Sequence, residues 1–115
     1  LVKDMTSNNY PRYLNELEYV VSPETERPWL FTNKFLTNDI LLVDAETAFV
    51  EKIFDFSVLY DIEMTREKEN NPRLTSYDKS NNVLNGIAYD PFNDVFYLTG
   101  KQWHFIFKVK IFWNF

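Results

Sequence analysis

The sequence predicts an all-β chain with one short inserted helix, and two observations support this prediction. Apolar, β-branched and aromatic residues gather in short runs that turn-forming residues separate. Similar units begin at Leu14-Asn15 and at Leu84-Asn85, about 70 residues apart, and each contains a strand ending in Thr that is followed two residues later by a lysine (Lys34 and Lys101). Self-similarity on this scale indicates stacked copies of one β unit, and four-stranded meanders repeated around an axis form a β-propeller.

Four strands are expected in the first half of the chain, after a short segment, Leu1–Met5, that can finish an earlier strand. Short turns join three of them, and an exposed loop with two prolines follows the first. The expected strands are Leu14–Val20, Trp29–Asn33, Asp39–Asp44 and Ala48–Asp55. Strands connected in this way form an antiparallel meander.

A helix is expected from Ser57, as its N-cap, to about Glu69. Its rough apolar face consists of Val58, Leu59, Ile62 and Met64. The polar segment from Asn70 to Asn82 is expected to be a long loop. Helix and loop together form an insertion, residues 56–82, that lengthens the repeat.

The second unit begins with a strand around Ile87 and continues through a turn at Asp90–Asp94 into the strand Val95–Thr99. Gly100 ends that strand, and Lys101 begins the following loop. The last expected strand is Phe105–Ile111, before an apolar end, Trp113–Phe115, that would be adhesive if exposed. Lysines alternate along that last strand, so they lie on one of its faces.

Composition excludes several functions for these 115 residues. Hydrophobic residues make up 45% and charged residues 25%, which is typical of a globular chain of one small domain. A net charge of −5 disfavours nucleic-acid binding, and no apolar run is long enough to span a bilayer. The sequence contains no cysteine and one histidine, His104, so neither a metal site nor a cofactor is expected. The first residue is not methionine, so the chain is expected to be a piece of a longer protein.

Two sequence blocks carry a family resemblance. VLNGIAYDP at Val83–Pro91, followed by FYLTGKQW at Phe96–Trp103, resembles the last motif block of the plant-type glutaminyl-peptide cyclotransferases, written LNGIAYDP and TGKxW. LNELEY at Leu14–Tyr19 resembles the preceding block. The resemblance implies a five-bladed propeller, of which this chain holds about two blades, Leu14–Asp55 and Leu84–Ile111. The remaining blades would lie upstream.

The resemblance also implies a reaction and a set of site residues. The family converts the N-terminal glutamine of a peptide or protein to pyroglutamate and releases ammonia, in a scheme that requires no metal. Asn15 and Lys101 match catalytic positions. Substrate-binding positions are assigned to Asn85, Trp103, Phe31 and Phe35, and the two phenylalanines replace the tryptophans of a W-A-N-x-W pattern. The phenylalanines keep an aromatic wall but lose the indole N–H group.

The resemblance leaves two functions open for this chain. The family's catalytic glutamate belongs to the upstream part, and Glu16 and Glu18 are interpreted as structural or solvated carboxylates. One hypothesis is therefore a glutaminyl-peptide cyclotransferase that is incompetent as an isolated piece. The other is a catalytically inactive propeller fragment that acts as an interaction module and self-associates through open strand edges. A secreted or extracellular location is implied by the family alone.

Overall fold

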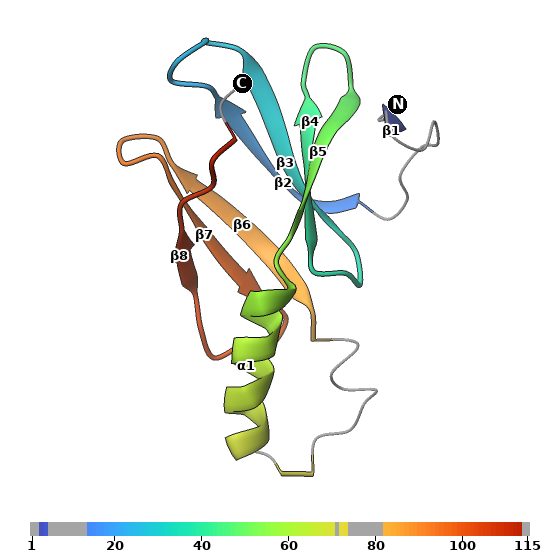
Figure 1. Cartoon of the computed structure of the whole chain (residues 1–115), viewed down its shortest axis with the longest axis vertical. Coiled ribbons are helices and arrows are strands. Elements are labelled where there is room, and N and C mark those ends of the chain that lie inside the picture. The colour runs from blue at the N-terminus through green and yellow to red at the C-terminus, as the bar shows by residue number, and fades with distance from the viewer. Residues whose placement is uncertain (1–2, 5–13, 71, 74–81, 114–115) are drawn as a thin grey trace.

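The computed structural model describes residues 3–4, 14–70, 72–73 and 82–113. Its elements are β1 (Lys3–Asp4), β2 (Leu14–Val21), β3 (Pro28–Lys34), β4 (Asp39–Asp44), β5 (Phe49–Asp55), α1 (Ser57–Asn70), β6 (Leu84–Asp90), β7 (Val95–Gly100) and β8 (Phe107–Val109). Figure 1 shows two sheets, in the strand orders β1-β5-β4-β3-β2 and β6-β7-β8, with α1 projecting beyond them. Apart from the parallel pair β1 and β5, every pairing is antiparallel. The predicted fold class, a β-propeller fragment with one inserted helix, is confirmed.

The four strands predicted in the first half are present within one residue of their expected bounds. Local turn chemistry fixes their connections. The Asp44 carboxylate accepts a hydrogen bond from the backbone N–H of Glu46 at 2.8 Å, which closes the turn between β4 and β5. The same carboxylate pairs with Arg27, whose guanidinium lies 4.9 Å from the ring centroid of Trp29. One acidic side chain thus links two turns of the first sheet.

The main core lies between the two sheets, with Phe31 among its fully buried residues. The Phe31 ring lies 5.1 Å from the Trp113 ring in an edge-to-face arrangement and 4.6 Å from the Phe96 ring. The buried residues of this core are Val20, Trp29, Phe31, Ile40, Leu42, Leu59, Leu84, Phe96, Leu98, Ile111 and Trp113. The Trp113 side chain of the predicted apolar end is buried between the sheets, so the exposure that would make this end adhesive does not occur at that residue; residues 114 and 115 lie outside the described residues.

Strand β4 is buried on both faces. Ile40 and Leu42 belong to the main core, whereas Leu41 and Val43 belong to a second cluster with Val50. Successive side chains of a strand point to opposite faces, so a continuous apolar run is what a strand between two packed layers requires.

The helix begins and ends close to the predicted residues, but its cap and its buried face differ from the prediction. Ser57 is the first helical residue, and its backbone N–H donates to the Asp55 carboxylate at 2.8 Å, so Asp55 supplies the capping oxygen. The buried helix residues are Leu59, Glu63 and Met64, whereas Val58 and Ile62 are exposed. No described helix combines the length and apolar composition needed to cross a bilayer.

The last strand, β8, is shorter than predicted because the chain before it bonds to other elements. Thr99 Oγ1 donates to the Phe105 carbonyl at 2.8 Å, and the Phe105 N–H donates to Glu63 Oε1 of α1 at 2.8 Å. These bonds connect Phe105 to β7 through a side chain and to α1, and the backbone ladder between β7 and β8 begins only at Phe107. Most of the predicted loop Asn70–Asn82 lies outside the described residues.

The two sheets repeat one irregularity at the positions that the sequence repeat marks. The register between β2 and β3 shifts between Leu14 and Leu17, and the register between β6 and β7 shifts between Leu84 and Ile87. Bulges of this kind re-aim the side chains they contain. The structure therefore places Asn15 and Asn85 on equivalent irregularities in two β units.

Candidate functional site

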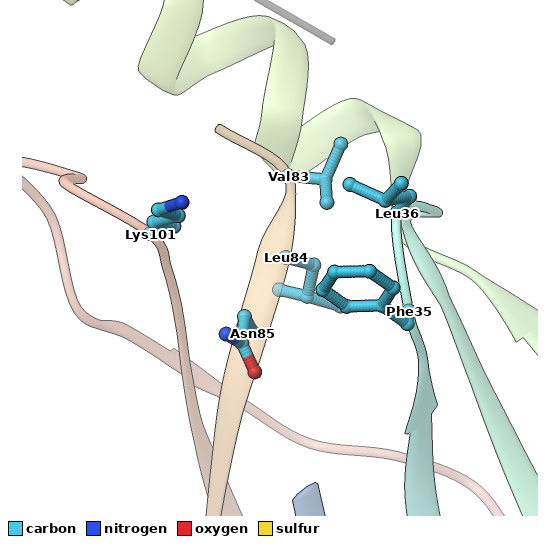
Figure 2. Close-up of a pocket in the computed structure, with 6 residues that line it drawn as sticks. All are labelled: Phe35, Leu36, Val83, Leu84, Asn85 and Lys101. Carbon is cyan, nitrogen blue, oxygen red and sulfur yellow. The ribbon is translucent and has the colours of Figure 1, made fainter. Parts of the chain in front are cut away.

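A small pocket opens where β6 meets the turn after β3. Its lining residues are Phe35, Leu36, Val83, Leu84, Asn85 and Lys101. Figure 2 shows Lys101 approaching β6 from one side, and Phe35 and Leu36 from the other. The cavity volume is about 50 Å³, which is room for a few water molecules. An apolar wall and two polar side chains thus meet in one hollow.

A hydrogen bond joins the pocket to the first sheet. Asn15 Nδ2 donates to Asn85 Oδ1 at 2.8 Å, across 70 residues of sequence. We call Asn15 and Asn85 the amide pair. This bond uses one donor of Asn15 and one acceptor of Asn85, and it leaves the oxygen of Asn15 and the NH2 group of Asn85 outside it. The pair therefore presents an acceptor next to a donor.

Lys101 is held at the pocket by its backbone and by a tryptophan. Its N–H donates to the Val83 carbonyl at 3.1 Å, directly across the pocket rim. Trp103 lies against Gly100, so closely that a Cβ atom added to Gly100 would lie 2.1 Å from the ring. Trp103 Nε1 donates to the Asn82 carbonyl at 2.6 Å. The indole thus fixes the turn from which Lys101 projects.

Two asparagines that the sequence argument did not select attach β6 to the first sheet. Asn33 Oδ1 accepts a hydrogen bond from the Gly86 N–H at 3.2 Å, and Asn38 Oδ1 accepts one from the Leu84 N–H at 3.1 Å. These bonds occupy N–H groups on either side of Asn85 in the bulged part of β6. Asn33 is 1% exposed and follows the apolar run Trp29–Phe31 of β3, and a polar residue next to such a run is the signal that could identify it from sequence.

The six predicted site residues do not all lie together. Lys101, Asn85 and Phe35 line the pocket, and Asn15 reaches it through the amide pair. Phe31 is 0% exposed in the core, and Trp103 supports the Lys101 turn without lining the pocket. The pocket also contains Leu36, at a backbone φ of 61°, and Val83, which the sequence argument did not include.

The nearby carboxylate Glu18 has a structural contact. Burial raises the pKa of Glu18, and a hydrogen bond from the Tyr89 N–H partly opposes that increase. This bond links β2 to β6 on the same side of the molecule as the amide pair. The arrangement agrees with the interpretation of Glu18 as a structural residue.

Comparison with known proteins identifies the family. The family model for glutamine cyclotransferase matches residues 2–111. The chain belongs to the glutamine cyclotransferase family. Among solved structures, it is similar to the glutaminyl cyclase of Myxococcus xanthus, with 28% sequence identity and a TM-score of 0.69. No curated protein matches the chain.

The match with the Myxococcus xanthus glutaminyl cyclase covers 95% of this chain but only 39% of that protein. The chain therefore spans less than half the length of its solved relative.

Proposed function

We propose that this chain supplies the amide-binding part of a glutaminyl cyclase site, which closes the N-terminal glutamine of a peptide into pyroglutamate. The observation that supports this proposal is the meeting of Lys101 with the amide pair at one pocket. The family assignment and the Myxococcus xanthus glutaminyl cyclase support the reaction class.

The amide pair matches the side chain of glutamine. A primary amide presents one acceptor oxygen and one NH2 donor, and the pair presents the complement, the NH2 of Asn85 and the oxygen of Asn15. A substrate amide lying beside the pair can donate to Asn15 and accept from Asn85. An ionised glutamate side chain has two acceptor oxygens and no donor, so it cannot donate to the oxygen of Asn15 and the same arrangement disfavours it.

Lys101 supplies the charge that the reaction needs. The α-amine of the substrate attacks the side-chain amide carbon, a C–N bond forms, and the carbonyl oxygen gains negative charge. An ammonium group beside that oxygen stabilises the charge as it develops. The attacking nitrogen then loses one proton and the leaving nitrogen gains one, so that the carbonyl reforms, the C–N bond to the leaving nitrogen breaks and ammonia departs. The attack is intramolecular, so little orientation remains for the protein to impose.

The test is cyclisation of a Gln-peptide by the complete protein with Lys101→Met, measured as ammonia release. We expect kcat/KM to fall by roughly 100-fold or more, the usual effect of removing a group that stabilises an oxyanion. Lys108→Met is the matched control, because Lys108 is an exposed lysine on β8. Equal activity in wild type and Lys101→Met would contradict the proposal.

A second function, an interaction module, is favoured by one observation. Large apolar side chains are exposed near the second sheet: Phe92 is 95% exposed, Phe112 is 85% exposed and Ile106 is 73% exposed. We propose that these residues and the open edge of β8 support self-association. Sedimentation should then show a mass that rises with concentration, and Ile106→Lys should abolish the rise. A single monomeric species at every concentration would contradict self-association.

A further inference from the structure

A carboxylate and histidine cluster lies away from the pocket, where α1 meets the loop after β7. Glu63 and Glu67 are one helical turn apart, so they lie on one face of α1. His104 lies in the loop between β7 and β8. Each residue offers one ligand atom, and these atoms all lie within 4.8 Å of one another. His104 Nε2 contacts Glu67 Oε2 directly. We call these three residues the Glu63 cluster.

Glu63 is the unusual member of the cluster. Its side chain is 0% exposed, although ionisable side chains are rarely buried without compensation. One oxygen, Oε1, accepts the Phe105 N–H, but the other, Oε2, is buried and finds no hydrogen-bond partner among the described residues. An unpaired buried carboxylate oxygen is costly, and a bound cation compensates it directly.

We propose that the Glu63 cluster binds a single divalent metal ion, Zn²⁺, through Glu63, Glu67 and His104. Two carboxylates and one neutral imidazole give three protein ligands and leave the fourth tetrahedral position to water. The two negative charges of the glutamates match the charge of the ion. The direct contact between His104 and Glu67 is replaced by two bonds to the metal.

The ligand set selects among cations. Imidazole favours zinc and other late transition metals, whereas calcium and magnesium prefer oxygen ligands alone and larger coordination numbers. In a tetrahedral site with bonds of about 2.0–2.2 Å, ligand atoms on one Zn²⁺ lie about 3.4 Å apart, so the three ligand atoms must move closer together when the ion binds. The His104 side chain is 41% exposed, so it has room to move and shorten the distances between the ligand atoms.

The proposed ion fastens α1 to the segment that carries Lys101. Glu63 already accepts the Phe105 N–H, and a metal would add His104 as a second connection between the same elements. This role is structural and separate from the proposed cyclisation. Metal binding is therefore measurable whether or not the protein cyclises glutamine.

The experiment is calorimetric titration of the chelator-treated, complete protein with ZnCl2, together with thermal unfolding with and without Zn²⁺. We expect one Zn²⁺ per chain and a higher Tm in its presence. His104→Ala and Glu67→Gln should each weaken binding at least tenfold and remove the Tm shift. Glu69→Gln, on the same helix but outside the cluster, should bind as wild type does, because Glu69 is 62% exposed and pairs with Arg66.

The proposal is overturned if wild type binds no Zn²⁺, if wild type and His104→Ala bind Zn²⁺ equally, or if the response to Ca²⁺ exceeds the response to Zn²⁺. Glu63→Gln keeps an acceptor for Phe105, so the variant also tests the buried ligand. Loss of Zn²⁺ binding in Glu63→Gln with a retained metal-free Tm supports the site, and full Zn²⁺ binding by that variant overturns the proposal.

Discussion

Asn15 Nδ2 donates to Asn85 Oδ1 at 2.8 Å, and the two residues occupy the same place in the two repeat units. Each lies where the register of its strand pair shifts. The repeat therefore brings two copies of one residue into contact, and the contact lies beside the pocket that Lys101 lines.

The amide pair should act as one unit toward substrate. Asn15→Ala and Asn85→Ala are each expected to raise KM for a Gln-peptide about fivefold, by removing a hydrogen bond worth about 1 kcal/mol. The double variant should be little worse than either single variant, because each change already breaks the pair. Steady-state kinetics of the four proteins measures this coupling, and two independent, multiplicative effects would show that the asparagines act separately.

Gly86→Ala should destabilise the second sheet. Gly86 has a φ of 150°, which residues with a side chain rarely adopt, and a Cβ atom there would lie 3.0 Å from Thr99 Cγ2. We expect a loss of about 1–3 kcal/mol in the free energy of unfolding, measured by urea denaturation. Adding Thr99→Ser removes the methyl group but leaves the backbone strain, so the double variant should recover only part of the loss. Full recovery of stability in the double variant would show that the contact with the Thr99 methyl group, and not the backbone strain, causes the whole loss.

Gly100→Ala should disturb Lys101 through Trp103. The new Cβ atom would overlap the indole ring, so the ring must move and its hydrogen bond to the Asn82 carbonyl must break. We expect a loss of about 1–3 kcal/mol in stability, as for other overpacked sites, together with a change in tryptophan fluorescence. An unchanged spectrum and stability would show that the turn adapts without moving Trp103.

Alkaline pH should destabilise the turn between β6 and β7 through Tyr89. Burial, with a hydrogen bond to Asp94, raises the pKa of Tyr89 from 10.0 to about 12. A raised folded-state pKa means that the tyrosine contribution to stability is complete below pH 10 and is lost as the pH rises toward 12. Tyr89→Phe should remove this part of the alkaline loss, as measured by urea denaturation at several pH values. An identical decline in wild type and Tyr89→Phe would assign the loss to other groups.

Acid should weaken the same turn through Asp94. Burial alone would raise its pKa, but hydrogen bonds from Lys110 and Tyr89 outweigh it and hold the pKa of Asp94 below its usual value. A lowered folded-state pKa means that the contribution is present above the ordinary pKa of an aspartate and is lost as the pH falls through the folded value. Asp94→Asn should therefore flatten the stability profile on the acid side, and a profile with an unchanged slope would contradict this role.

The sequence by itself determined the order and the bounds of most elements. Alternating apolar residues and turn chemistry are local properties, so strands β2 to β5 and the turn at Asp90–Asp94 could be predicted from their own residues. The repeat and the two family blocks are sufficient to select Asn15, Asn85 and Lys101 as candidate site residues from the sequence alone. Asn15 and Asn85 occupy equivalent places because each lies where the register of its strand pair shifts.

Tertiary structure decided which side chains face one another. Phe31 and Phe35 look equivalent in the sequence, yet Phe31 is fully buried and Phe35 lines the pocket. Packing against the sheets also determines that Leu59 and Glu63 lie on the buried face of α1. The same packing buries Trp113. Contacts between segments far apart in the chain depend on how the sheets and helix pack, and no local pattern encodes that packing. For the same reason, the approach of Glu63 and Glu67 to the single histidine was visible only in three dimensions.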